Sequence, residues 1–319
     1  MPPREYEMND LKKSVSISIL ICCYNSESRI KQVLSSLEKQ KISTNLLEVI
    51  IIDNASLDTT YSVSTSYIDS FPFKLSVFKE PISGLMNARI RGIKEAKNDL
   101  IIFVDDDNLL DTDYCYKAHQ LFSEKTDIAF AGGESRLPLY ISPPTWFDKY
   151  SKCYAVGPQY NESRYLCGAE ILWGAGLIVR REMLLTIINY DFKCVGRKGN
   201  IQLSGDDSEL CYLLILNGGI GYYYSELKLQ HAIDTSRFNI DKLLQVYRGF
   251  GQSFPILVKY RMRIVTGNNL GKIKNIIYSN RKLFVFYSYI RRYEAICRGN
   301  KLMIEYWNGC LKTLNNLPN

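Results

Sequence analysis

Residues 100–107 read LIIFVDDD, an apolar run of five residues that leads directly into three aspartates. A run without polar interruption and rich in Ile and Val predicts a strand that is buried on both faces of a sheet. Similar apolar runs occupy residues 16–22 (SISILIC), 46–52 (LLEVIII) and 73–78. The intervening segments are expected to be helical, at residues 26–37 (with Ser26 as N-cap), 59–68 and 85–96. Strands that alternate with helices predict an α/β domain with a mainly parallel central sheet and helices on both faces.

The second half of the sequence predicts a more mixed arrangement. The expected elements are a strand at 171–180 that contains Gly174-Ala175-Gly176, a helix at 206–216, a strand at 222–229 before His231, and a helix at 237–259. Two or three further helices are expected after them. The sequence contains neither GxGxxG nor GxxxxGK[ST], so neither a dinucleotide-binding fold nor a P-loop is supported.

Polar residues follow every strand of the first half. They are Tyr24-Asn25, Asp53-Asn54, Glu80 and Asp105-Asp106-Asp107. Ligands of open parallel sheets bind beyond the carboxyl ends of the strands, so this convergence predicts a binding site there. Asp53 and Asn54 offer acceptors for a nucleobase N–H group. Each polar pair alone is equally compatible with an ordinary turn.

The three aspartates Asp105, Asp106 and Asp107 are the sharpest chemical feature. Adjacent carboxylates repel one another unless a cation neutralises them, and carboxylate oxygens suit Mg²⁺ or Mn²⁺, which complete their coordination with substrate phosphates. His231 follows a β-rich segment and can add a nitrogen ligand to such a metal. The alternatives are a solvated acidic loop or helix N-terminus for the aspartates, and a hydrogen-bonded structural role for His231.

Two further sites carry candidate functional groups. Gly205-Asp206-Asp207 precedes the helix at 206–216, and a carboxylate there can serve as general base for a hydroxyl nucleophile. An N-capping pair is the alternative. Gly84 opens the helix at 85–96, where Arg89 is available to a phosphate or to the carboxylates. A helix start with a solvated arginine is the alternative.

The order of these motifs resembles that of the family 2 glycosyltransferases of the GT-A fold. The resemblance is carried by three segments of the first half, SISILICCYNSESRIKQVLSSLEKQ, EVIIIDNASLDTT and EPISGLMNARIRGIKEAKNDLIIFVDDDN. It covers residues 16 to about 108 closely and continues more loosely through WGAGLIVRREML, SGDDSELCYLL and LQHAIDTSRF. Each motif alone is common, but their combined order and spacing are specific.

The resemblance implies roles for individual residues. Tyr24, Asn25, Asp53 and Asn54 would hold the nucleobase and ribose of a nucleotide sugar, with Arg89 nearby. Asp105 and Asp107 would be the DxD pair, with Asp105 near the ribose, Asp106 between them and Asp107 on the metal, which His231 supports. Asp207 would be the catalytic base. Asp206 stands where the family usually has Glu, which leaves the choice between Asp206 and Asp207 open. Trp173 would stack on the acceptor sugar or belong to the core.

Composition and charge suggest how the chain is divided. Residues 259–319 contain twelve Lys and Arg against two acids, whereas the rest of the chain is nearly neutral. We therefore expect a GT-A catalytic domain at 1–258, with a nucleotide-binding half at about 14–108 and an acceptor half at about 109–258, followed by a basic helical region at 259–319. The basic region suggests an anionic partner, a membrane surface rather than nucleic acid. Its aromatic residues are equally compatible with packing on the catalytic domain.

The chain is accordingly expected to be cytoplasmic, or peripheral at the inner face of the membrane. Residues 1–13 lack the apolar core of a signal peptide, no apolar run is long enough to span a bilayer, and an odd number of cysteines (nine) without a CxxC pair argues against a disulfide framework. The expected activity is metal-dependent, inverting transfer of a hexosyl or N-acetylhexosaminyl group. The donor would be a nucleotide sugar, UDP-linked by family resemblance, and the acceptor a glycan or lipid-linked saccharide in polysaccharide or glycoconjugate biosynthesis. A degenerate glycan-binding or scaffolding protein and a nucleotidyltransferase are the alternatives.

Overall fold

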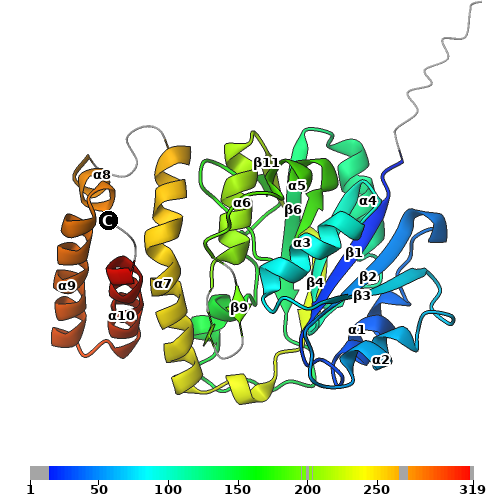
Figure 1. The fold of residues 1–319 in the computed structure, drawn as a ribbon, viewed down its shortest axis with the longest axis horizontal. Coiled ribbons are helices and arrows are strands. Elements are labelled where there is room, and N and C mark those ends of the chain that lie inside the picture. The colour runs from blue at the N-terminus through cyan, green and yellow to red at the C-terminus, as the bar shows by residue number, and fades with distance from the viewer. Residues whose placement is uncertain (1–13, 195, 199–200, 203, 266–271, 317–319) are drawn as a thin grey trace, which may run out of the picture.

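The computed structural model describes residues 14–194, 196–198, 201–202, 204–265 and 272–316. Its first half alternates strands and helices: β1 (Ile17–Cys23), α1 (Ile30–Leu37), β2 (Leu47–Asn54), α2 (Thr60–Thr65), β3 (Lys74–Glu80), α3 (Leu85–Glu95) and β4 (Leu100–Asp105). Strand β1 pairs in parallel with both β2 and β4, and β2 pairs in parallel with β3. The four strands therefore end at one edge of the sheet, as the sequence predicts (Figure 1).

The second half adds shorter and partly antiparallel elements. They are β5 (Asn108–Leu110), α4 (Tyr114–Glu124), β6 (Ile128–Arg136), β7 (Arg164–Tyr165), β8 (Ile178–Arg180), α5 (Arg181–Ile187), α6 (Asp206–Leu216) and β11 (Ile220–His231). The main sheet has the order β3-β2-β1-β4-β8-β6-β11-β5, with β7 paired to β11. Strand β8 runs antiparallel to both β4 and β6, whereas β6 and β11 are parallel. A separate small hairpin joins β9 (Arg197–Lys198) and β10 (Ile201–Gln202).

Two layers of helices cover the two faces of the sheet. Alternate residues of β1, including Ile17 and Ile19, pack in one core with α1 and α4. Leu20 points the other way and packs in a second core with α3, α5 and α6. Helix α3 lies so close to β1 that a Cβ added at Gly92 would come 2.1 Å from Leu20 Cδ1. The apolar runs read from the sequence are therefore strands buried on both faces, as expected for a mainly parallel sheet.

The C-terminal region is a helical unit that packs beside this layered domain. It consists of α7 (Ile240–Ile264), α8 (Lys272–Ser279), α9 (Arg281–Cys297) and α10 (Lys301–Asn316). Helix α10 packs against both α7 and α9, around a core that includes Phe284, Trp307 and Cys310. Residue 259, where the sequence predicts this region to begin, lies inside α7, which also packs on α6. Helix α9 lies farthest from the sheet (Figure 1).

Two local expectations are wrong. Helix α1 begins at Ile30 with Arg29 as N-cap, so Ser26 does not cap it. The Ser26 hydroxyl instead donates a hydrogen bond to the carboxylate of Asp106. Of the strand expected at 171–180, only Ile178–Arg180 forms a strand. Glycines 174 and 176 belong to a loop, and the φ of +73° at Gly176 is a left-handed conformation that favours glycine.

Candidate active site

A pocket of about 410 Å³ opens at the carboxyl ends of the central strands. The pairing register explains why acidic residues meet there, because Cys23 of β1 stands opposite Asp53 of β2 and Cys22 stands opposite Asp105 of β4. The volume lies within the range of about 300–1,000 Å³ that is usual for small-molecule sites. Among the residues expected from the sequence, those that line the pocket are Tyr24, Asn54, Arg89, Asp105, Asp106, Asp107, Trp173, Asp206, Asp207 and His231. Asn25 and Asp53 are not among the residues that line the pocket.

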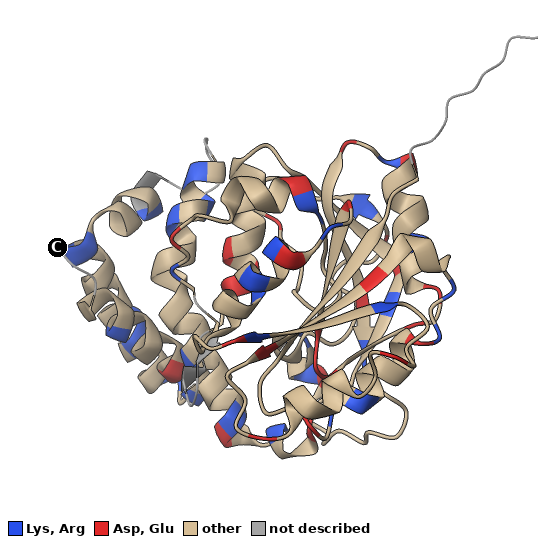
Figure 2. Cartoon of the chain, turned by 45° about the vertical axis from the view of Figure 1, so that its right-hand side comes forward, with Lys and Arg blue, Asp and Glu red and all other residues tan. Residues whose placement is uncertain are grey.

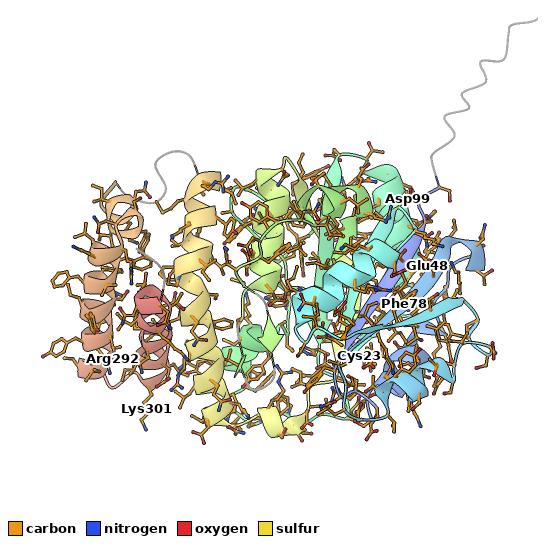
Figure 3. All side chains as sticks on the ribbon, viewed as in Figure 1. Cys23, Glu48, Phe78, Asp99, Arg292 and Lys301 are labelled. Carbon is orange, nitrogen blue, oxygen red and sulfur yellow. The ribbon has the colours of Figure 1, made fainter. Side chains whose placement is uncertain are left out.

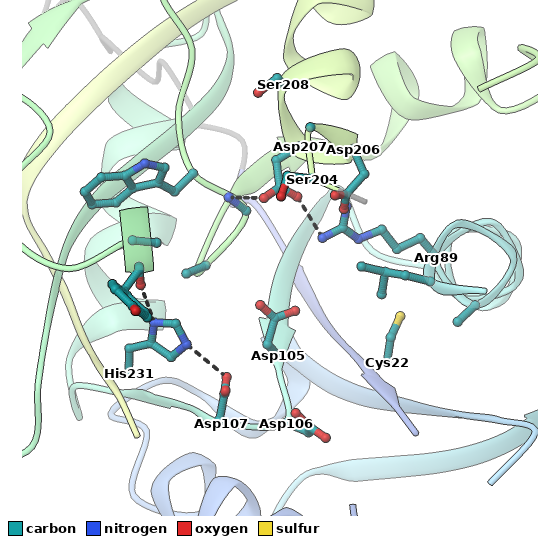
Figure 4. Close-up of a pocket in the computed structure, with 18 of the residues that line it drawn as sticks. Cys22, Arg89, Asp105, Asp106, Asp107, Ser204, Asp206, Asp207, Ser208 and His231 are labelled. Atoms are coloured by element: carbon teal, nitrogen blue, oxygen red, sulfur yellow. Dashed lines mark hydrogen bonds and ion pairs between the residues drawn. The ribbon is translucent and has the colours of Figure 1, made fainter. Parts of the chain in front are cut away.

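Asp107 and His231 meet because β5 pairs with the end of β11. Asn108 of β5 stands opposite His231 in the antiparallel register, and this places His231 Nε2 3.4 Å from Asp107 Oδ1. His231 Nδ1 lies 3.0 Å from the carbonyl oxygen of Tyr154. A carbonyl only accepts hydrogen bonds, so Nδ1 carries a proton, and in the neutral ring Nε2 presents a lone pair toward the carboxylate. Figure 4 shows both contacts.

This arrangement fits a divalent cation that is completed by a ligand. A neutral imidazole nitrogen that faces a carboxylate oxygen needs a cation or a proton between them, and both groups are ligands of Mn²⁺ and Mg²⁺. The hydrogen bond to Tyr154 orients the ring as in known metal sites. Among the residues described, no three His, Cys, Asp or Glu side chains are grouped closely enough to hold a metal.

Asp106 has a different environment from Asp107. Its carboxylate forms an ion pair with Arg29 Nη2 at 2.5 Å and accepts a hydrogen bond from the hydroxyl of Ser26. The Ser26 backbone N–H in turn donates to the hydroxyl of Thr60 at 2.7 Å. Asp106 therefore ties the loop after β4 to the loop after β1.

Asp206 and Asp207 lie at the other end of the pocket, at the start of α6. Arg89, only 4% exposed, reaches across from α3 and places Nη1 2.7 Å from Asp206 Oδ2 and Nη2 2.8 Å from Asp207 Oδ1. The side chain of Asp206 is 11% exposed and that of Asp207 is 34% exposed. Burial, together with the negative charge of Asp207, raises the pKa of Asp206 to about 7 even beside Arg89. Asp207 is thus the more accessible carboxylate. Figure 4 shows both carboxylates beside Arg89.

The loop of residues 173–176 fixes the orientation of Asp207. The Gly174 backbone N–H donates to Asp207 Oδ2 at 3.0 Å, and a Cβ added at Gly174 would lie 2.2 Å from Asp207 Oδ1. Only glycine lets the backbone approach the carboxylate this closely. The neighbouring Trp173 is half-buried and lines the pocket, with its backbone N–H bonded to Gln159.

The groups expected to hold a nucleoside lie at the ends of β1 and β2. Tyr24 is 43% exposed. Asn25, at a φ of +48°, accepts a hydrogen bond from the Leu57 N–H, and Asn54 uses its whole amide to hold the backbone of Glu80, Ile82 and Gly84. Asp53 is 5% exposed, and its buried Oδ1 has no hydrogen-bond partner among the described residues. This oxygen is buried and Asp53 is not part of the pocket lining.

Sequence reasoning missed several residues of the pocket. Arg237 places Nη1 3.7 Å from Asp107 Oδ2, and Lys152 and Arg29 also line the pocket. The sequence offers a signal for Arg237, because it follows His231 by six positions in the segment LQHAIDTSRF. It offers none for Lys152, because this residue lies on a 3-10 helix, η2 (Asp148–Tyr154), that has no marked sequence pattern.

Comparisons with known proteins find similarity to glycosyltransferases. Residues 18–138 match the sequence model described as glycosyl transferase family 2. The poly(ribitol-phosphate) beta-N-acetylglucosaminyltransferase TarS of Staphylococcus aureus strain Mu50 is 29% identical over 96 residues, 30% of this chain and 17% of TarS. The cholesterol galactosyltransferase of Borreliella burgdorferi is 25% identical over 191 residues, 56% of this chain and 51% of that protein. The alignments span a third or less of the first curated relatives.

Solved structures resemble the fold over nearly the whole chain. The mannosyltransferase PcManGT of Pyrobaculum calidifontis, in complex with GDP-Man and Mn²⁺, has a TM-score of 0.60 at 13% identity and covers 94% of this chain and 87% of its own. TarS 1–349 of S. aureus in complex with UDP-GlcNAc has a TM-score of 0.54 at 14% identity, with 92% and 90% covered.

The mixed sheet, with acidic residues gathered at the ends of its parallel strands, defines a GT-A fold. Residues 18–138 are similar to glycosyl transferase family 2, and the fold of nearly the whole chain is similar to that of TarS.

Proposed function

We propose that this protein is an inverting, metal-dependent glycosyltransferase. The observation that carries the proposal is that a single pocket holds two separate acidic centres, Asp107 with His231 at one end and Asp207 with Asp206 and Arg89 at the other. Transfer with inversion requires a group that stabilises the departing diphosphate and a base on the opposite side of the sugar. The two centres can supply these two roles.

The donor is proposed to be a nucleotide-diphosphate sugar. Tyr24 and Asn54, which line the pocket, are proposed to contact the nucleoside, with Asn25 and Asp53 next to them in the sequence supporting the same end of the site. Arg237 and Lys152 contribute positive charge to the pocket near Asp107. TarS is described in complex with UDP-GlcNAc and PcManGT with GDP-Man. These names support a nucleotide sugar as a class, and we propose a UDP-linked hexose or N-acetylhexosamine.

Asp107 and His231 are proposed to hold Mn²⁺ or Mg²⁺ together with the donor, and Asp105, which the sequence also suggests as a ligand, is proposed to face the donor beside them. When bound, the cation neutralises the negative charge that develops on the diphosphate as the sugar leaves. Asp107 and His231 contribute their facing oxygen and nitrogen. Arg237, which faces the other oxygen of Asp107, holds that carboxylate in place and adds a positive charge at the same end of the pocket.

Asp207 is proposed to be the general base. The acceptor hydroxyl attacks the anomeric carbon from the side opposite the diphosphate, its proton passes to Asp207, and the bond between the anomeric carbon and the phosphate oxygen breaks. The products are the extended acceptor and the nucleoside diphosphate. Arg89 and the Gly174 N–H hold Asp207 in place. Trp173, beside this base, offers an aromatic face to the acceptor sugar.

The acceptor is proposed to be a glycan or a lipid-linked saccharide in polysaccharide or glycoconjugate biosynthesis. The described residues contain no helix that is both long and apolar enough to cross a membrane. We propose that the chain acts in the cytoplasm or peripherally at the inner membrane face.

Binding and catalysis can be tested separately. Thermal shift or calorimetry with UDP, GDP and TDP, each with and without Mn²⁺, tests the nucleotide site. We expect one nucleotide to bind, more tightly with Mn²⁺, and Asp107→Ala to remove the metal effect. Binding of saccharides without any nucleotide binding would favour the glycan-binding alternative. Nucleotide triphosphate binding in preference to the diphosphates would favour a nucleotidyltransferase.

A further inference from the structure

Large apolar side chains form an exposed stripe along the outer face of α9. The α9 stripe consists of Leu283, Phe286, Tyr289, Ile290 and Tyr293, which are between 42% and 67% exposed. Residues spaced by three, four and seven positions lie on one side of a helix. The stripe is therefore one continuous surface rather than scattered exposed residues. Figure 3 shows side chains that project from α9 on the side away from α10.

The stripe is not the core-facing side of α9. That side is formed by Phe284, Ser288 and Ala295, which are buried, and Phe284 belongs to the core shared with Trp307 and Cys310 of α10. A helix at the edge of a protein normally packs one apolar side on the core and presents polar residues to water on the other side. A second, exposed apolar side signals an interaction surface.

Positive charge borders the stripe. Lys282 and Arg298 are exposed at its two ends, whereas Arg291 is paired with Glu294 at 3.1 Å and Arg292 Nε donates to Asn308 Oδ1 of α10 at 2.6 Å. Residues 259–319 contain Glu294 and Glu305 as their only acids. Along these helices the ribbon accordingly carries more blue (Lys and Arg) than red (Asp and Glu) in Figure 2. The surface is thus both apolar and cationic.

These charges distinguish between two occupants of the stripe. If a second copy of the chain packed its own stripe antiparallel to this one, Lys282 of each copy would approach Arg298 of the other. Like charges across an interface oppose association. An anionic surface would instead be attracted by Lys282 and Arg298 at both ends of the stripe.

We propose that α9 docks on an anionic lipid bilayer, with the α9 stripe in the boundary between headgroups and acyl chains. Tyr and Phe beside Lys and Arg are the side chains that helices use to lie in this boundary. Each basic residue close to an anionic surface strengthens binding about fivefold. Lys282 and Arg298, together with the apolar side chains of the stripe, are therefore sufficient for reversible attachment. The inference does not depend on the proposed enzymatic function.

Flotation of the full chain with vesicles tests the proposal. Phosphatidylcholine vesicles with and without phosphatidylglycerol are compared at low salt for wild type, Phe286→Ser/Tyr293→Ser and Lys282→Gln/Arg298→Gln. Leu57→Ser/Leu139→Ser is the matched control, because both leucines are highly exposed but lie far from α9 in the sequence. All substituted residues are exposed, so the fold should survive, which circular dichroism verifies.

We expect wild type to float only with anionic vesicles. The partition coefficient should fall about tenfold or more in the stripe variant and severalfold in the charge variant, and should not change in the control. Absence of flotation at low salt, equal flotation with neutral vesicles, or flotation unchanged by Phe286→Ser/Tyr293→Ser would overturn the proposal. So would a dimer in light scattering that the same variant converts to a monomer, because a second copy would then cover the stripe.

Discussion

At the scale of single residues, the proposed mechanism requires that Asp206 and Asp207 have different roles. Arg89 contacts both carboxylates, but Asp206 is nearly buried and Asp207 is one-third exposed and held by the Gly174 N–H. The geometry therefore supports Asp207 as the base and Asp206 as a residue that positions Arg89. The sequence could place both acids at the start of a helix, but their burial depends on α3, which lies more than a hundred residues away.

Asp207→Asn is expected to keep donor binding and to lose about 100-fold or more in kcat, the usual size of a general-base contribution. The amide is nearly isosteric and its oxygen can still accept from the Gly174 N–H, so the fold should persist. Steady-state kinetics with calorimetric donor titration would measure both quantities. If Asp206→Asn is the crippling change and Asp207→Asn is mild, the assignment within the pair is wrong.

The pH dependence of transfer should follow the same pair. The pKa of Asp206 is raised to about 7 because the carboxyl is buried and faces Asp207. A carboxyl with a raised pKa takes up a proton as the pH falls through that value, and in a coupled pair this proton is shared. We therefore expect kcat/KM to decline below about pH 7. The decline near neutrality should be absent in Asp206→Asn, and an acid limb that this change leaves in place would contradict the assignment.

At the scale of elements, the runs with strong apolar patterns were predictable and the short strands were not. The strands of the first half, the helix from Asp206 to Leu216 and the long helix α7 follow from hydrophobic spacing and helix signals. Strands β5 and β8 are three residues long. They are stabilised by the register of their neighbours rather than by a pattern of their own, so the sequence could not show that β5 carries Asp107 to His231.

The crossing of α7 and α10 is a further element that only the structure reveals. A Cβ added at Gly309 would lie 2.1 Å from the Arg248 carbonyl oxygen, and one added at Gly251 would lie 1.7 Å from the Tyr306 carbonyl oxygen. The backbones of α7 and α10 are therefore in contact at Gly251 and Gly309, where neither helix has a side chain.

Gly309→Ala should force the two helices apart and lower the free energy of unfolding by about 1–3 kcal/mol, the usual cost of overpacking. Lys312→Ala, at an exposed position of the same helix, should leave stability nearly unchanged. Chemical denaturation of both variants would measure the difference. Equal stability of Gly309→Ala and wild type would show that the crossing is looser than described.

At the scale of the whole molecule, the GT-A fold is confirmed by the structural likeness to PcManGT and TarS. The sequence could not predict which C-terminal aromatic side chains are buried and which face water. Phe284, Tyr306 and Trp307 pack in the helical core, whereas Phe286, Tyr289 and Tyr293 face water. This division depends on the rotation of α9 against α10, which hydrophobic spacing alone does not fix in a helix with two apolar sides.

The most direct test of the central claim is nucleotide release from a panel of UDP-, GDP- and TDP-sugars, measured with Mn²⁺ and a mixture of saccharide acceptors. We expect release from at least one donor, loss of release in excess EDTA, recovery when Mn²⁺ or Mg²⁺ is restored, and no release by Asp107→Ala. Full activity in excess EDTA, or undiminished activity of Asp107→Ala, would contradict the proposed metal centre. Failure to release nucleotide from any donor that the protein binds would contradict the proposal that the pocket catalyses transfer.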